Sequence, residues 1–238
     1  MMFNFEEGEV FLIDKPLDWT SFDAVNLIRA LVKRYHGIKK LKVGHAGTLD
    51  PLATGLLIVC TGKKTKQIDE YQAKEKVYSG TMLLGRTTPT FDLESEPDAL
   101  FPVDGITEKM MQSVCNSFVG DILQRPPKFS AIKINGKRAF DYARSDKELE
   151  MKERNVHIFD FKIDTKRFPE IDFVVKCSKG TYIRSLVNDF GKALNNGACL
   201  TALRRTHIGD YCVDDAWDLM ELKKTIIENG CDHDVKIE

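Results

Sequence analysis

The stretch that decides the fold is Gly44-His45-Ala46-Gly47-Thr48-Leu49-Asp50-Pro51-Leu52-Ala53-Thr54-Gly55-Leu56-Leu57. Its first twelve residues contain three glycines and one proline and predict a loop, and the apolar run 56–60 that follows predicts a strand. Asp50 is the only acid between residues 24 and 67, a window with nine lysines and arginines. An acid in a basic field stays ionised and available to react, so Asp50 is the first candidate for a functional carboxylate.

Charge is balanced over the chain but uneven along it. The 238 residues carry 35 Lys plus Arg and 36 Asp plus Glu, a formal net charge of -1, so the total does not indicate a polyanionic partner. From residue 208 onward nine acids stand against three lysines, which makes the tail acidic. The basic window suggests a surface for phosphates, although a solvated helix face and loop would explain the charge equally well.

Composition and missing motifs exclude several classes of protein. With 42% hydrophobic and 30% charged residues the chain can bury a core. It has no apolar run of the roughly 18 residues that a membrane helix needs, and the start lacks a signal peptide, so we expect a cytoplasmic protein. The six cysteines form no C-x-x-C pair, which predicts no metal site and no disulfides. Walker, G-x-S-x-G and H-E-x-x-H patterns are absent, which removes the usual support for nucleotide-binding and hydrolase functions.

Hydrophobic periodicity predicts a single α+β domain over residues 1–238, because strands and helices alternate without a repeat or a linker. The expected strands are 9–13, 56–60, 77–84, 156–163, 171–177 and 200–207. The expected helices are 21–35, 107–118, 139–144, 181–194 and 216–228, with an extended segment at 124–130. Ser21 is expected to cap the first helix, and Asp214 or Asp215 the last. In the strand 77–84, Tyr78 is expected to point inward with Met82 and Leu84.

Four further stretches, together with the loop around Asp50, match the motifs of one known family in the order in which that family has them. They are Leu12-Ile13-Asp14-Lys15-Pro16 with Thr20-Ser21, Lys76-Val77-Tyr78, Pro126-Pro127 through Ser130-Ala131-Ile132-Lys133 to Tyr142-Ala143-Arg144, and Cys177-Ser178-Lys179-Gly180-Thr181-Tyr182-Ile183-Arg184. The set resembles the TruB family of tRNA pseudouridine-55 synthases over about residues 9–207. The resemblance implies the α+β pseudouridine synthase fold, with a mixed, mostly antiparallel central sheet flanked by helices and loops. The chain departs from the family after this core: the residues predict an acidic helical tail over about 208–238, which we expect to be too short for the PUA-type RNA-binding domain that family members commonly carry.

The resemblance implies an isomerase that turns the uridine at position 55 in the T loop of tRNA into pseudouridine. The partner would be the T arm of tRNA, the enzyme would be a monomer, and no cofactor would be needed, because the reaction loses no atoms and exchanges no electrons.

Asp50, Tyr78 and Arg184 match the family's catalytic residues. By the same resemblance Asp50 is the reacting carboxylate, Arg184 pairs with it, and Tyr78 stacks on the base and serves as general base. His45 would fill the space that the flipped uridine leaves. The other residues expected to bind substrate or support the site are Lys15, Leu203, Tyr182, Lys63, Lys64, Lys133 and Lys137. The last two belong to a basic insertion that resembles the family's thumb loop.

Two other functions stay open from the residues alone. A nucleosidase or glycosidase could use Asp50 as nucleophile, although the nearest downstream acids, Asp69 and Glu70, lie in no motif. A non-catalytic tRNA-binding or folding module would need only the basic window. Free uracil as a product would indicate the first, and an Asp50→Asn protein as effective as wild type would indicate the second.

Overall fold

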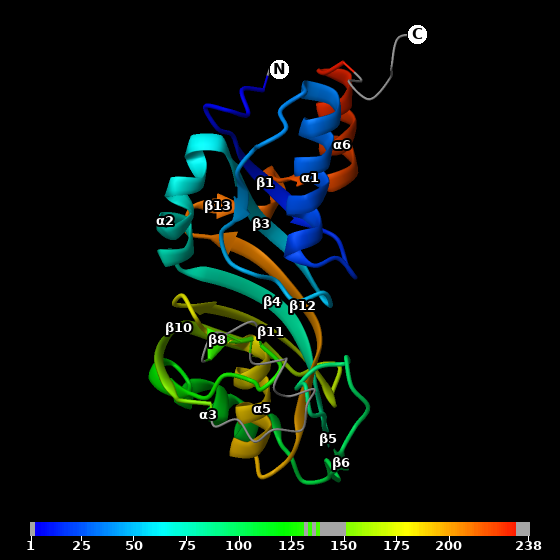
Figure 1. Cartoon of the computed structure of the whole chain (residues 1–238). Coiled ribbons are helices and arrows are strands. Elements are labelled where there is room, and N and C mark those ends of the chain that lie inside the picture. Colours follow the sequence, from blue (N-terminus) through cyan, green and yellow to red (C-terminus); the bar gives the residue numbers. More distant parts are fainter. Residues whose placement is uncertain (1–2, 131–132, 135–136, 139–150, 232–238) are drawn as a thin grey trace. The chain divides into compact units, whose positions relative to one another are not determined.

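The computed structural model describes residues 3–130, 133–134, 137–138 and 151–231. The chain divides into two compact units (Figure 1): unit 1 is Met1–Val77 with Arg204–Glu238, and unit 2 is Tyr78–Leu203. The chain passes between the units within two strands, β4 (Lys76–Leu84) and β12 (Ala198–Ile208).

The sheet of unit 1 is mixed, with the strand order β14-β1-β3-β12. β1 pairs in parallel with β14 and antiparallel with β3, and β2 and β13 add antiparallel partners to β3 and β12. The bounds are β1 Val10–Lys15, β2 Val43–His45, β3 Ala53–Thr61, β13 Tyr211–Cys212 and β14 Trp217–Asp218. The fully apolar run in β3 is buried on both faces, as a central strand requires.

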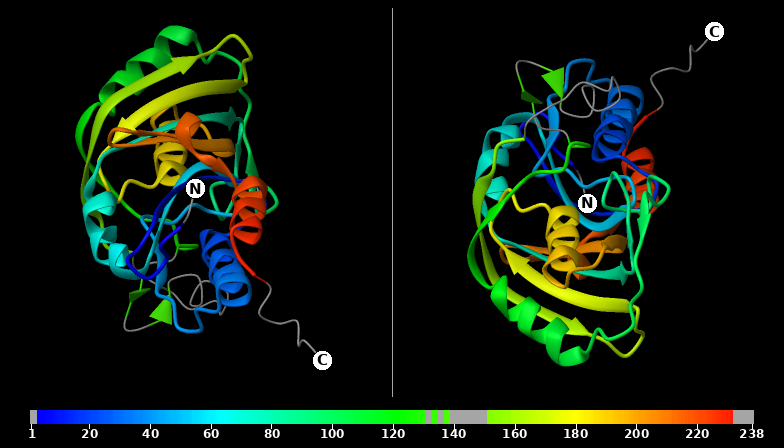
Figure 2. Two further views of the ribbon diagram at one scale, coloured as in Figure 1. Left: turned by 90° about the horizontal axis from the view of Figure 1, so that it is seen from above. Right: turned by 90° about the horizontal axis from the view of Figure 1, so that it is seen from below.

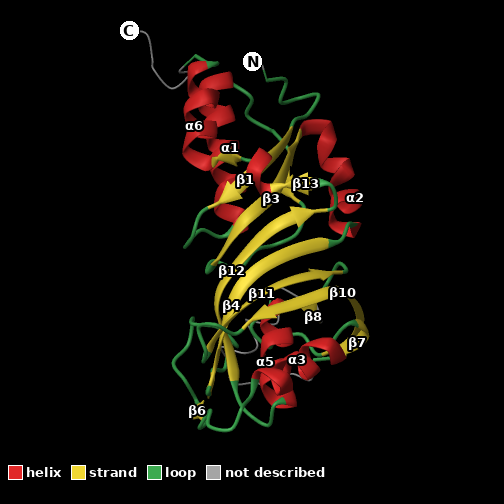
Figure 3. Ribbon diagram, turned by 180° about the vertical axis from the view of Figure 1, so that it is seen from behind, coloured by secondary structure: helices red, strands yellow, loops and turns green. Residues whose placement is uncertain are grey.

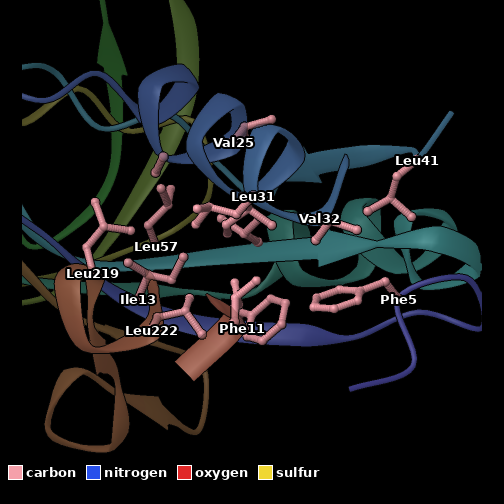
Figure 4. Close-up of a cluster of buried hydrophobic side chains, with 14 residues drawn as sticks. Phe5, Phe11, Ile13, Val25, Leu31, Val32, Leu41, Leu57, Leu219 and Leu222 are labelled. Atoms are coloured by element: carbon pink, nitrogen blue, oxygen red, sulfur yellow. The ribbon is translucent and has the colours of Figure 1, made fainter. Parts of the chain in front are cut away.

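Two helices cover one face of this sheet, α1 (Ser21–His36) and α6 (Leu219–Glu228), which lie side by side (Figure 2). Their apolar residues recur at helical spacing and meet those of β1 and β3 in one core (Figure 4). Ile13, Leu57 and Leu222 are fully buried there, each worth about 1.5–3 kcal/mol relative to exposure. Unit 1 also contains η1 (Gly62–Gln67), α2 (Ile68–Ala73) and η2 (Val213–Asp215).

Unit 2 orders its strands β12-β4-β11-β10-β7, with β10 antiparallel to both neighbours. Figure 3 shows α3 and α5 side by side against these strands, and Phe161 of β10 packs its ring on Phe190 of α5 at 6.1 Å. The bounds are β5 Arg86–Thr87, β6 Ala99–Leu100, α3 Glu108–Ser117, β7 Gly120–Gln124, β8 Lys133–Ile134, β9 Lys137–Arg138, β10 Arg154–Asp164, β11 Glu170–Cys177 and α5 Ile183–Ala193.

The predicted fold class is confirmed: the described residues form mixed, mostly antiparallel sheet with five α-helices. Both predicted helix caps are wrong. Thr20, not Ser21, caps α1, because its hydroxyl accepts from Asp23 N while the Asp23 carboxylate accepts from Thr20 N. The last helix starts at Leu219, capped by Asp218, since the preceding residues form η2 and β14. The predicted helix 139–144 lies outside the described residues.

Candidate active site

The loop that carries Asp50 joins β2 to β3 in unit 1. Ala46 N donates to Ile58 O at 2.9 Å, and Ala53 N donates to Asp50 O at 3.1 Å. Backbone hydrogen bonds therefore fix both ends of the loop. Leu49 is buried, whereas Asp50 is partly exposed. The loop therefore points Leu49 into the protein and leaves Asp50 partly accessible to solvent.

The buried hydroxyl of Ser21 ties this loop to α1. Ser21 Oγ accepts from Leu49 N at 2.8 Å and donates to Leu49 O at 3.2 Å. Since Thr20 caps the helix, Ser21 is left to satisfy both backbone groups of the residue just before Asp50. Adjacent hydroxyls thus have different tasks: one starts the helix and the other holds the loop.

Lys15, at the end of β1, is fully buried and binds backbone carbonyls around the loop. Its Nζ donates to Trp19 O at 2.6 Å, to Pro16 O at 2.8 Å and, at a longer 3.4 Å, to Pro51 O. Burial lowers the pKa of Lys15 from 10.5 to about 8, although the negative charges of Asp50 and Asp18 oppose that shift. These bonds join Lys15 to the backbone at residues 16, 19 and 51, and its support of an active-site loop stays a prediction.

His45 ends β2, five residues before Asp50, and is partly buried. Burial, and secondarily the positive charge of Arg205, lower the pKa of His45 below 6.5, so the imidazole is neutral at pH 7. A neutral ring can enter a stack of bases without carrying a charge into it.

In unit 2, Arg184 lies near the start of α5 and is 4% exposed. Its Nη1 donates to Thr90 O at 2.9 Å and its Nη2 to Phe129 O at 2.8 Å, while its Nε lies 3.6 Å from Asp92 Oδ2. The other carboxylate oxygen of Asp92 accepts from Thr90 Oγ1 at 2.6 Å and from Glu94 N at 3.0 Å. The guanidinium is therefore held in one orientation by groups on two segments distant in sequence.

Asp92 is not among the site residues that the sequence predicts. The available signal was the alternation Thr88, Thr90, Asp92, in which two hydroxyls precede a carboxylate on a segment that the structure buries.

Tyr78, Tyr182 and Leu203 also lie in unit 2. Tyr78 is buried with Met82 on the inward face of β4, as its spacing predicted. Tyr182 precedes α5, where its N–H donates to Gln124 Oε1 at 2.8 Å and the Arg154 guanidinium lies 5.6 Å from its ring centroid. Leu203 is partly buried on β12.

The predicted phosphate-binding lysines lie on separate segments. Lys63 and Lys64 are exposed on η1, where Lys63 Nζ pairs with Glu7 at 2.7 Å. Lys133 and Lys137 lie in the paired strands β8 and β9. The turn between those strands lies outside the described residues.

The site residues thus fall into two groups, each described within its own unit. Unit 1 brings together the loop of Asp50, Lys15, Ser21 and His45, and unit 2 contains Tyr78, Arg184, Tyr182 and Leu203. Among the described residues, no three His, Cys, Asp or Glu side chains gather closely enough to hold a metal ion. The helices in that same part of the chain include none long and apolar enough to cross a membrane.

Two family matches account for most of the chain. Residues 33–183 match the N-terminal domain of the TruB family of pseudouridylate synthases, and residues 184–236 match the C-terminal domain of tRNA pseudouridylate synthase B. The chain belongs to the TruB family of pseudouridylate synthases. The resemblance read from the motif around Asp50 is thereby confirmed.

TruB-family relatives match over nearly their whole length. The "tRNA pseudouridine synthase B" of Flavobacterium johnsoniae is 52% identical over 221 residues, which are 92% of this chain and 96% of the relative. That of Phocaeicola vulgatus is 53% identical over 212 residues, 89% and 90% of the two chains.

Among solved structures, a chain of a Cbf5-Nop10-Gar1 complex is similar with a TM-score of 0.68 and 26% identity. The likeness covers 92% of this chain and 54% of that one, so the TruB-family chain spans about half of its length. A chain of an H/ACA RNP bound to a substrate RNA containing 2'-deoxyuridine is similar with a TM-score of 0.66.

Proposed function

We propose that this protein is a tRNA pseudouridine synthase that isomerises the uridine at position 55 in the T loop of tRNA. The observation that carries the proposal is the 52% identity to a protein named tRNA pseudouridine synthase B over 92% of this chain and 96% of the relative. The loop of Asp50 supports it, because that loop is anchored by buried side chains while its aspartate stays accessible.

The reaction breaks the bond from N1 to C1′ of the ribose, turns the base, and joins C5 to the same carbon. Asp50 supplies the carboxylate, either by attack on C1′ or by assisting removal of the C2′ proton. No atoms are lost, so the pocket must retain the freed uracil until the new bond forms. Arg184, fixed by Asp92 and two carbonyls, is the cation proposed to orient Asp50.

The remaining roles concern the base and the RNA backbone. Tyr78 stacks on the target base and accepts the C5 proton, and Leu203 and Tyr182 line the pocket. His45 occupies the gap left by the flipped uridine, a role that its neutral ring suits. We expect the enzyme to act as a monomer in the cytoplasm.

Lys63, Lys64, Lys133 and Lys137 are proposed to contact phosphates of the T arm. Replacing Lys133 and Lys137 by Ala should weaken tRNA binding and reduce the slope of log K against log salt by about 0.7–0.9 for each phosphate that is no longer neutralised. An Ala substitution at Lys109, exposed on α3, is a control that should leave the slope unchanged. An unchanged slope in the double variant would contradict the proposed phosphate contacts of Lys133 and Lys137.

The function is tested by tritium release from unmodified tRNA labelled at uridine C5. Wild type should release one tritium per tRNA, and Asp50→Asn, which keeps the side-chain shape, should release none. A transcript with cytidine at position 55 controls for the site. Free uracil among the products would indicate a nucleosidase, and binding of tRNA without release would indicate a non-catalytic module.

A further inference from the structure

Arg205 on β12 is a cation buried inside unit 1. It is 1% exposed and is among the largest fully buried side chains in the described part of the chain. A guanidinium removed from water is costly unless its N–H groups find acceptors, so the acceptors that Arg205 uses identify what it organises.

Those acceptors lie on either side of Asp50. Arg205 Nη2 donates to Gly47 O at 3.1 Å, and Nε donates to Leu56 O at 2.8 Å. Gly47 precedes the aspartate by three residues and Leu56 follows it by six. One rigid, planar group thus joins the entrance of the loop to the strand that receives it.

The backbone of Arg205 is fixed by the same segment. Gly55 has φ 100°, and a Cβ on it would lie 2.3 Å from Arg205 O and 2.8 Å from Arg205 N. β3 and β12 therefore approach each other here as only a glycine permits. The side chain of Arg205 starts from a backbone that is held in place, so its reach to Gly47 O is well defined.

Its charge also acts on the same neighbourhood. Burial is the main cause of the lowered pKa of both His45 and Lys15, and the positive charge of Arg205 lowers both further. The guanidinium thus lies within electrostatic reach of two residues assigned to the site.

We propose that Arg205 is a positioning residue for Asp50, acting through the carbonyls of Gly47 and Leu56 to hold the loop in its reactive path. The inference rests on the proposed function for its kinetic consequence, but the clamp itself is a property of the loop. It predicts a loss of rate without a loss of RNA affinity, because the guanidinium binds the protein's own backbone.

The test uses the full chain with Arg205→Met, which removes the charge and both hydrogen bonds, and Arg205→Lys, which keeps the charge but cannot bridge both carbonyls. Arg204→Met is the matched control. Arg204 neighbours Arg205 on the same strand and binds side chains: it forms an ion pair with Asp14 at 2.6 Å, and its Nη1 lies 3.5 Å from Thr54 Oγ1 at the start of β3. Single-turnover pseudouridine formation and the Kd for tRNA are measured for each variant, well below its melting temperature.

Arg205→Met should lower the single-turnover rate about 100-fold, as misplacement by about 1 Å does, with the Kd within about twofold of wild type. Arg205→Lys should remain at least about tenfold slow, and Arg204→Met should stay within about twofold of wild type. A wild-type rate for Arg205→Lys would overturn the two-carbonyl clamp, and a weakened Kd that accounts for the loss in Arg205→Met would overturn positioning.

Amide hydrogen exchange supplies a readout that does not depend on activity. Residues 46–53 should exchange faster in both Arg205 variants than in wild type and Arg204→Met, while α3 in unit 2 stays unchanged. Arg205→Lys retains the buried charge and keeps this comparison possible if Arg205→Met does not fold. A wild-type protein that forms no pseudouridine would refute the proposed function, whereas unchanged exchange in the loop would refute the role of Arg205.

Discussion

Lys15 offers a sharp test of the electrostatics around the loop, because its ammonium is fully buried and its hydrogen bonds go to neutral carbonyls. Burial lowers the pKa of Lys15 from 10.5 to about 8 in the folded protein. Between pH 8 and 10.5 the unfolded chain therefore holds a proton that the folded protein has released. Unfolding takes up that proton, so this residue makes the folded state relatively more stable as the pH rises through that range.

The linkage relation gives the magnitude. With pKa values of about 8 folded and 10.5 unfolded, the contribution of Lys15 to the free energy of unfolding rises by about 2 kcal/mol between pH 7 and 9.5. Burial raises the pKa of Cys60 to about 11 and that of Cys115 to about 12, which acts in the opposite direction. These groups keep in the folded state a proton that the unfolded chain loses, so wild type alone would not reveal the effect of Lys15.

The effect is isolated by comparing wild type with Lys15→Met, which shares those thiols. Urea denaturation followed by circular dichroism at pH 7, 8, 9 and 9.5 gives the free energy of unfolding of each protein. The free energy of unfolding of wild type minus that of Lys15→Met should increase by about 2 kcal/mol from pH 7 to 9.5. Lys33→Met, at an exposed position on α1, should give a flat difference. A flat or falling difference for Lys15→Met would refute the argument that burial dominates its charge state.

Three further substitutions test other parts of the structure. Thr20→Ala removes the cap of α1 and should lower the free energy of unfolding by about 1 kcal/mol in urea denaturation, with the rate of pseudouridine formation unchanged. Gly55→Ala should cost about 2–4 kcal/mol, because it adds overlap with the neighbouring backbone to a strained φ, whereas Gly105→Ala, with φ 83° and open space around it, should cost about 1 kcal/mol. Asp92→Asn keeps the hydrogen-bonding shape but removes the charge beside Arg184, so single-turnover rates should fall at least about tenfold without weaker tRNA binding, and an unchanged rate would contradict the structural role of Asp92.

Most of the fold could be predicted from the sequence because buried apolar residues recur at regular spacing, about every second residue in strands and every third or fourth in helices. The two-residue alternation placed Tyr78 and Met82 inward on β4, and both are buried. The predicted cap of the first helix was wrong because Thr20 and Ser21 are both good capping residues when each is considered alone. The spacing to Asp23, three residues after Thr20, decides between them, since only that pair completes a reciprocal capping box.

The candidate site was only partly predictable. Asp50 and Lys15 lie in motifs that can be read locally, but Arg205 binds a carbonyl 158 residues away in the sequence. Every residue has a backbone carbonyl, so the type of residue at a position does not show whether its carbonyl accepts a bond from Arg205. Asp92 was missed for a related reason, because its value comes from the approach of Arg184 from another segment. Such contacts depend on which strands become neighbours, and periodicity does not specify that.

The anchors described around Asp50 explain why this dependence on backbone groups suits the loop. Ser21 binds the N–H and C=O of Leu49, Arg205 binds Gly47 O, and Lys15 approaches Pro51 O. All three bind the backbone of the loop, and none of these bonds uses the aspartate carboxylate, so they hold the loop without engaging the side chain that is proposed to react. Two of the anchors, Lys15 and Arg205, are fully buried cations, and taking a cation out of water has a free-energy cost that an apolar side chain does not have. Their presence beside Asp50 therefore argues that Lys15 and Arg205 serve the geometry of this loop more than the stability of the fold.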